Sequence, residues 1–214
     1  MANANGAFGL KPISKLGGNV NSTGNSGYTM YEIKSDNSNV IYQGSPVIPL
    51  STGFIDIVGA AAGGTVGLLG AFGGCEFVSS TTGKLTFSNH FPGSGIDSNH
   101  PVKARVFDDP MQLYAIASDA SLTNEATLRS HVFANANFSS GTSGSTVTGK
   151  SSAALGVSTV GTNANLNLRI MGWLPEPENS DFAAAGIPVI VRLNNHFNSP
   201  NGAIAGGTVS TTGV

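Results

Sequence analysis

The residue types that most often carry metal or acid–base chemistry are sparse in this chain. Four histidines, one cysteine and twelve acidic residues are spread over 214 positions. His90, His100, His131 and His196 lie far apart, and none forms a His-x-x-x-His pair or a Cys/His cluster with the spacing of zinc ligands. The sequence therefore predicts no transition-metal site and implies no cofactor.

Two acidic turns are candidates for a site that binds a hard cation through oxygen ligands. Asp108-Asp109 forms one of them, and Glu176, Glu178 and Asp181 lie in the second. Calcium needs several carboxylate or carbonyl oxygens that converge on one point. The two turns would form a site only if they met in the fold, and solvated loop carboxylates are the simpler interpretation.

No nucleophile motif is complete. Residues 24–27 (Gly-Asn-Ser-Gly) resemble the nucleophile turn of serine proteases, but no His or Asp precedes them in the order of chymotrypsin-like enzymes. The Gly-x-Ser-x-Gly elbow and the Gly-x-x-x-x-Gly-Lys-Ser/Thr phosphate loop are absent. We therefore predict that the chain is not an enzyme. A polysaccharide hydrolase with two carboxylates in a folded cleft is the enzymatic alternative.

Composition favours a folded, weakly charged protein. Charged residues make up 10% of the chain, hydrophobic residues 40%, and the net charge is -2, which is not the composition of a disordered chain. The ten basic residues are scattered singly and offer no stripe for a phosphate backbone, so we expect no direct nucleic-acid partner. The lone Cys75 is expected to be a small buried hydrophobe of a protein made in a reducing compartment.

Neither a membrane span nor a secretion signal is expected. No apolar run reaches the roughly 18 to 20 residues that a membrane helix needs. Residues 1–6 lack the basic start and apolar core of a signal peptide. We expect no membrane partner and synthesis in a cytosol.

The elements that would position any functional side chain are short strands. From Tyr28 onward, apolar runs are separated by Gly, Pro and Asn at short intervals, which predicts an all-β barrel or sandwich. Val102–Phe107 alternates apolar and basic residues with the period of a half-buried strand. Further strands are expected at residues 28–33, 40–43, 54–58, 111–117, 166–170 and 187–193.

The strand pattern also suggests pairings. We expect residues 111–117 to pair with Val102–Phe107 across the Asp108-Asp109 turn, and residues 166–170 to pair with 187–193. Residues 44–50 contain two prolines, which remove ladder donors, so this segment should be an edge strand or an irregular crossing.

Three segments differ from the strands in composition and hydrophobic pattern. Residues 124–132 are expected to form a short helix with Thr123 as its cap. Residues 139–152 are rich in Ser, Thr and Gly and predict an exposed loop, and residues 199–214 form a tail of the same character.

The first 27 residues predict an extended arm. They are rich in Asn and Gly but contain one apolar island, made by Phe8, Leu10, Pro12 and Ile13. These side chains must dock somewhere, either on the protein's own body or on a neighbour. If the arm is an anchor for a neighbour, its removal should leave the body folded.

Several motifs resemble virion proteins of tailed bacteriophages. They include the arm sequence Gly-Ala-Phe-Gly-Leu-x-Pro-Ile at residues 6–13, Tyr-Gln-Gly-x-Pro-Val at 42–47, and Asn-Asn-His-Phe at 194–197. Within this resemblance, residues 44–47, 53–55 and 66–70 are similar to the small β barrel of lambda-type head decoration (cement) proteins.

The resemblance implies a domain order and a role. It implies an arm at 1–27, a decoration-like barrel portion at 28–80, a second β lobe or barrel elaboration at 81–198 and a tail at 199–214. The implied role is a capsid decoration protein on the virion surface, made in the host cytoplasm, which binds the major capsid protein as a homotrimer.

Two sets of residues are then the candidate contacts. The capsid-binding set is Phe8, Leu10, Pro12 and Ile13, and the candidate subunit interface is Tyr42, Pro46, Phe72 and Trp173. A head fibre, a tail component or a receptor-binding virion protein, with residues 139–152 touching a host surface, is the alternative from the same class.

Overall fold

The computed structural model describes residues 3–16, 27–58, 67–199, 203–204 and 208–209. Within them the chain is predominantly β, which confirms the predicted all-β class, and its sheets stay open, without a closed barrel. Residues 24–26 of the Gly-Asn-Ser-Gly segment, residue 66 of the decoration-like motif at 66–70 and most of the tail lie outside the described residues.

The first sheet has the strand order β2-β7-β5-β3-β4, with β6 also paired to β5, and every pairing is antiparallel. Its strands are β2 (Thr29–Ile33), β3 (Pro46–Pro49), β4 (Ile55–Ile57), β5 (Gly70–Val78), β6 (Leu85–Ser88) and β7 (Val102–Phe107).

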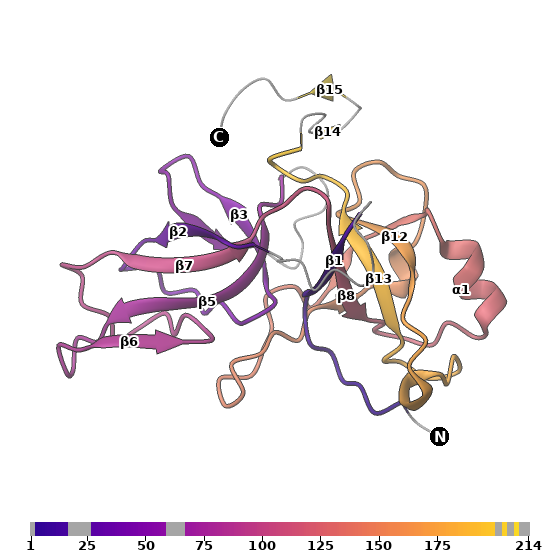
Figure 1. Ribbon diagram of the computed structural model, residues 1–214, viewed down its shortest axis with the longest axis horizontal. Helices are drawn as coiled ribbons and strands as arrows, with labels where there is room; N and C mark the ends of the chain where they lie inside the picture. Colours follow the sequence, from indigo (N-terminus) through magenta and orange to yellow (C-terminus); the bar gives the residue numbers. More distant parts are fainter. Residues whose placement is uncertain (1–2, 17–26, 59–66, 200–202, 205–207, 210–214) are drawn as a thin grey trace.

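The second sheet has the order β1-β8-β13-β12-β9 and is also antiparallel. Its strands are β1 (Lys11–Lys15), β8 (Gln112–Ala117), β13 (Pro188–Leu193), β12 (Leu168–Trp173) and β9 (Asn135–Ala136). Figure 1 shows the two sheets side by side, with β1 and β8 at the centre of the molecule.

Small elements complete the fold. They are α1 (Glu125–His131), the paired strands β10 (Phe138–Ser139) and β11 (Ala154–Leu155), the 3-10 turns η1 (Val157–Thr159) and η2 (Pro177–Asn179), and the paired strands β14 (Ala203–Ile204) and β15 (Thr208–Val209). Among the described residues, no helix has the length and hydropathy to cross a membrane.

Each sheet packs one face against a hydrophobic core. In the second sheet, Tyr114 and Ile116 of β8 lie beside Val189 and Val191 of β13 in a core that also takes Leu128 from α1. Successive side chains of a strand point to opposite faces, so the residues between these, such as Ala115 and Arg192, lie on the other side. We call that side the outer face of the second sheet.

The expected hairpin between residues 102–107 and 111–117 is wrong. β7 already has β2 and β5 on its two edges, and β8 has β1 and β13, so neither strand has a free edge for the other. The Asp108-Asp109 segment therefore carries the chain from the first sheet to the second. The predicted pair of closing strands, β12 with β13, is confirmed.

The expected boundary at residue 80 falls between β5 and β6, which pair in the first sheet. β7 belongs to the first sheet, and β1, from the predicted arm, belongs to the second. The sheets divide the chain near residue 108, because strand partners come from whichever edges are free rather than from neighbouring sequence.

Three local expectations are also corrected. β3 is not an edge strand but lies between β5 and β4, and Pro46 still serves the sheet because its carbonyl accepts from the Val58 amide at 3.0 Å. Residues 40–43 form only isolated bridges. The cap of α1 is Asn124, whose side chain accepts from the Thr127 amide at 2.9 Å, and not Thr123.

The predicted exposed loop at 139–152 is exposed only in part. Its tip residue Val147 is 95% exposed, but Ser151 is buried. The returning limb pairs with Gln43, whose amide donates to the Gly149 carbonyl at 2.9 Å while its carbonyl accepts from the Ser151 amide at 2.9 Å. The base of the loop is thus part of the body.

Candidate binding groove

The N-terminal arm docks on its own chain. β1 pairs with the edge of β8, and Leu10 is only 1% exposed because it enters the core of the second sheet. The Gly9 amide donates to the Ala153 carbonyl at 3.0 Å, and the Leu10 amide donates to the Gly44 carbonyl at 2.8 Å. Of the two destinations left open by the sequence, the arm takes the protein's own body.

Asparagine side chains fasten the start of the arm. The Asn3 amide group donates to the Asp181 and Ala185 carbonyls at 3.0 and 2.8 Å, and the Asn5 backbone amide donates to the Asn179 side chain at 2.8 Å. The second acidic turn therefore receives the arm, which accounts for its position in the fold without a cation.

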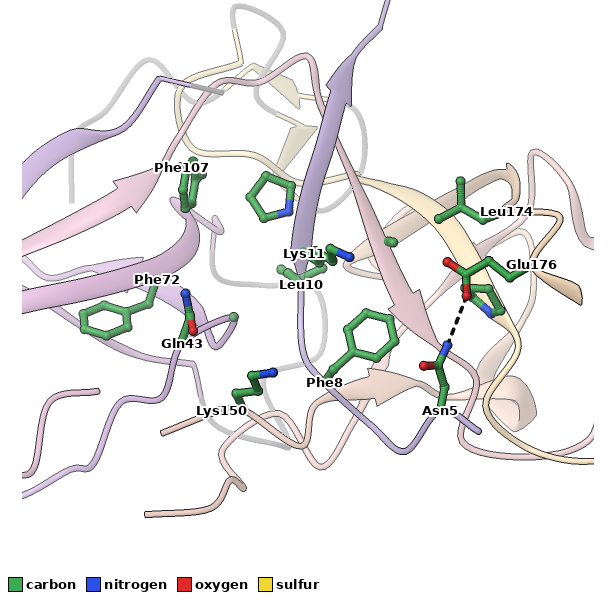
Figure 2. Close-up of a pocket in the computed structure, with 14 residues that line it drawn as sticks. Asn5, Phe8, Leu10, Lys11, Gln43, Phe72, Phe107, Lys150, Leu174 and Glu176 are labelled. Atoms are coloured by element: carbon green, nitrogen blue, oxygen red, sulfur yellow. Dashed lines mark hydrogen bonds between the residues drawn. The ribbon is translucent and has the colours of Figure 1, made fainter. Parts of the chain in front are cut away.

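The docked arm forms one wall of a groove of about 460 Å³. The opposite wall comes from the first sheet and its loops, through Phe72, Phe107, Gln43 and Gly44, and the remainder from the second sheet. Figure 2 shows Phe8 near the middle of the groove, between Lys150 and Glu176, with Lys11 above it in this view. The apolar lining residues are Phe8, Leu10, Pro12, Phe72, Phe107, Ala115, Leu174 and Pro188.

The polar lining carries a positive balance. Lys11 and Lys150 are exposed, and neither forms an ion pair with any of the described residues. Glu176 already accepts from the Asn179 side chain at 2.9 Å and from the Asn5 side chain at 3.5 Å. The groove thus offers an apolar floor and two unpaired ammonium groups, a combination suited to an extended segment with apolar and acidic side chains.

Four residues that the sequence assigned to two separate contacts meet in this groove. Phe8, Leu10 and Pro12 came from the predicted capsid-binding set and Phe72 from the candidate subunit interface. Ile13 lies half-buried in β1 and does not line the groove.

The candidate subunit interface is largely unavailable at the surface. Pro46 and Phe72 are buried in the first sheet, and Tyr42 is 9% exposed, with its ring stacked on His90 at a centroid distance of 6.2 Å. Trp173 is half-buried under the Arg129 guanidinium, 5.2 Å from the ring centroid. Aromatic residues in short strands are common both in the interior of a sheet and at a subunit interface. Residue type alone therefore could not show which of these two positions they occupy.

The first acidic turn holds the two sheets together. Asp108 accepts from the Tyr31 hydroxyl at 2.7 Å and from the Thr29 hydroxyl at 2.9 Å, both in the first sheet. Asp109 forms an ion pair with Lys15 of the second sheet, and this contact lowers the pKa of the Asp109 carboxyl. In the described part of the chain, no three His, Cys, Asp or Glu side chains come together as metal ligands.

The remaining chemically active residue types are buried or dispersed. Burial raises the pKa of the Cys75 thiol to about 12, as expected for a core hydrophobe, and burial lowers the pKa of His196 to about 4. Within the groove lining, Glu176 is the only carboxylate. A glycoside hydrolase needs two, so the groove lacks that arrangement.

Sequence reasoning missed Lys150 and Glu176 as groove residues. Lys150 lies in a low-complexity loop and Glu176 in a turn, and neither stretch carries a chemical motif. Only the pairing of Gln43 with the loop base and the docking of the arm on η2 bring them beside Phe8. Comparisons of the chain with protein-family models, with curated proteins and with solved structures give no match.

Proposed function

We propose that this chain is a non-catalytic virion protein that binds and stabilises the assembled capsid lattice of a tailed bacteriophage as a decoration protein. The partner is the major capsid protein. The proposal rests on the resemblance of the arm and strand motifs to phage head proteins and on the groove as the structural feature suited to such a partner.

The observation that carries the proposal is the composition of the groove wall. An extended segment lying in the groove would touch the arm at Phe8, the first sheet at Phe107 and the second sheet at Pro188. It would therefore bind three parts of the chain at once. A ligand that binds only the assembled lattice stabilises that state by mass action, and such a contact needs no catalytic group.

The docked arm changes which side chains can meet the capsid. Leu10 is committed to the protein's own core, so we assign the contact to Phe8 and Pro12, which are half-buried, together with Lys11 and Lys150. The arm still adds a strand to a sheet edge, but the edge is that of β8 in the same chain. Pro12 and the two lysines of β1 are residue types that protect a free sheet edge from unwanted pairing.

A homotrimer is the assembly that the resemblance favours. Because Pro46 and Phe72 are buried, subunit contacts would use other apolar side chains. Leu85 and Phe87 of β6 are 58% and 62% exposed. Light scattering of the purified protein measures the oligomeric state, and a monomer at all accessible concentrations contradicts this part of the proposal.

The experiment that tests the proposed function is a cryo-microscopy reconstruction of particles of the virus that encodes the chain, combined with mass spectrometry of their protein copy numbers. We expect density at threefold or quasi-threefold positions of the capsid and a copy number comparable to that of the major capsid protein. Density on the tail alone, or a few copies per particle, overturns the decoration role.

A receptor-binding role has one observation in its favour. The tip of the loop at 139–152 presents Val147, 95% exposed, between two threonines. The same reconstruction separates the roles, because a receptor-binding protein lies at a tail or fibre tip.

A further inference from the structure

Two arginines face each other across neighbouring strands of the second sheet. Arg169 of β12 and Arg192 of β13 are direct cross-strand partners. Both lie on the outer face, because their neighbours Leu168 and Val191 point into the core. Like charges directly opposite one another destabilise a sheet, and within the described ranges no acidic side chain forms an ion pair with either arginine.

The two guanidinium groups differ in their hydrogen bonds. The Arg169 Nε donates to the Asn135 side-chain oxygen at 3.0 Å. The Arg192 Nε is buried without a hydrogen-bond partner among the described residues. Burial and the charge of Arg169 lower the pKa of Arg192. A buried donor without an acceptor costs free energy, and the two facing guanidinium groups repel each other. An anion bound between the two groups would offset that repulsion.

An exposed aromatic residue is joined through its backbone to β12, one residue along the strand from Arg169. Phe133 is 73% exposed and has a φ of 71°, in the left-handed region. It follows the cap residue of α1, the position where glycine is the usual choice. Its amide donates to the carbonyl of Ile170, the residue next to Arg169, at 2.8 Å. A bulky side chain held at positive φ is strained, and such strain clusters at binding sites.

We infer that Arg169, Arg192 and Phe133 form a docking site for a carboxylate-bearing segment of a partner protein. An aspartate or glutamate of the segment bridges the two guanidinium groups, whose planar donors match a carboxylate. An apolar side chain of the same segment packs on Phe133. Arginine and aromatic residues are the types most enriched at the energetic centres of protein interfaces.

The charge pattern favours a protein segment over nucleic acid. The chain has a net charge of -2, and the outer face offers a pair of arginines rather than the row of basic residues that tracks a phosphate backbone. The site is separate from the groove residues, and the inference holds whether or not the partner is a capsid.

Two blocked peptides serve as probes, tetraglutamate and the alternating Glu-Leu-Glu-Leu, with tetraglutamine as the neutral control. Each is titrated into the ¹⁵N-labelled full chain, and the Nε–Hε signals of its arginines are followed by NMR. We expect both acidic peptides to shift the signals of Arg169 and Arg192, and tetraglutamine to shift neither.

Variants separate the site from general charge attraction. Arg192→Gln and Arg169→Gln should each weaken both acidic peptides about tenfold or more, whereas Arg105→Gln, on the first sheet, should not. Phe133→Gly should leave tetraglutamate binding unchanged and remove the advantage of Glu-Leu-Glu-Leu.

The contrary results are equally specific. Equal shifts with tetraglutamine, equal loss in Arg105→Gln, or unchanged binding in both arginine variants overturn the inference. Inorganic phosphate that binds the pair more tightly than tetraglutamate shows a phosphate site and overturns the assignment to a protein segment. Because the peptides contain no capsid component, these results are independent of the reconstruction that tests the decoration role.

Discussion

Gly9 lies directly against Gly44 at the point where the arm enters β1. A Cβ atom built on Gly9 would stand 2.6 Å from the Gly44 carbonyl oxygen, closer than any side chain tolerates. Both residues have positive φ, 76° and 84°. The same carbonyl accepts the Leu10 amide at 2.8 Å. The arm therefore reaches its own sheet only because neither position carries a side chain.

This contact predicts the effect of Gly9→Ala. The new methyl group meets backbone, which cannot rotate away, and alanine is strained at this φ, so we expect a loss of at least about 1–2 kcal/mol in the free energy of unfolding. Hydrogen exchange of the β1 amides should accelerate more than that of the β5 amides. Gly6→Ala is the matched control, because a Cβ there meets nothing within 4 Å. Equal stability of the two variants contradicts this account of arm docking.

The buried position of Leu10 predicts that the arm is not dispensable. Leu10→Ala removes a fully buried side chain and should cost about 2–5 kcal/mol, measured by urea unfolding. Deletion of residues 1–13 removes most of β1 as well and uncovers the edge of β8. We expect a destabilised, aggregation-prone body, in place of the folded body anticipated from the sequence. A truncated chain of wild-type stability would show that β1 adds nothing to the fold.

Lys11 and Lys150, which form no ion pair with the described residues, predict a charge-dependent contact of the groove with the capsid. Replacing Lys11 and Lys150 together with Gln should weaken binding to purified particles about tenfold, with the largest difference at low salt. Lys84→Gln provides the control, since Lys84 is exposed in the turn before β6 and does not line the groove. The affinity is measured by sedimentation of the labelled protein with particles that lack it. Identical affinities for the wild type, the double variant and Lys84→Gln would show that the groove does not bind the capsid.

We expect Phe133→Gly to weaken partner binding without lowering the stability of the fold. Glycine adopts a φ of 71° without strain, and the lost side chain is mostly exposed, so the free energy of unfolding should stay constant or rise by about 1 kcal/mol. Thermal unfolding checks the change. Phe133→Ala, which keeps the strain, is the comparison and should be the less stable of the two. A marked loss of stability in the glycine variant would mean that Phe133 serves the fold and not a partner.

His196 predicts the acid sensitivity of the fold. Burial is the main cause of its low pKa of about 4, and the Asn198 amide donates to its Nδ1 at 3.0 Å. The unfolded chain binds a proton near the ordinary value of 6.5, whereas the folded chain does not. Stability is therefore fully present above pH 6.5 and falls as the pH drops toward 4, by about 3 kcal/mol at most.

Urea unfolding at several pH values tests this window. His196→Asn keeps an acceptor for the Asn198 amide but does not titrate, so its stability should change less between pH 6.5 and 4 than that of the wild type. The lowered pKa of Asp109 moves its own titration below this range. Parallel curves for wild type and His196→Asn would assign the acid response to other groups.

Local patterns were sufficient for the individual strands. Alternation in Val102–Phe107 and in residues 187–193 predicted β7 and β13, because side chains of a half-buried strand must alternate between core and solvent. The apolar island at Phe8 and Leu10 was also recognisable as a segment that had to dock.

The pairing of those strands could not be predicted from the sequence. Strands far apart in the chain compete for the same sheet edges, and a short stretch of sequence carries no information about which of them pairs. β8 follows β7 by a four-residue link yet pairs with β1 and β13, so the nearest strand in sequence was the wrong one.

By itself, the sequence determined that the chain is all-β, weakly charged, without a complete catalytic or metal motif, and equipped with an apolar arm. Only the tertiary structure decided that the arm closes its own sheet, that Lys11 and Lys150 share a groove, and that Arg169 faces Arg192. The reason is physical: residue type and period specify which face of a strand is buried, whereas register and strand order specify which side chains meet.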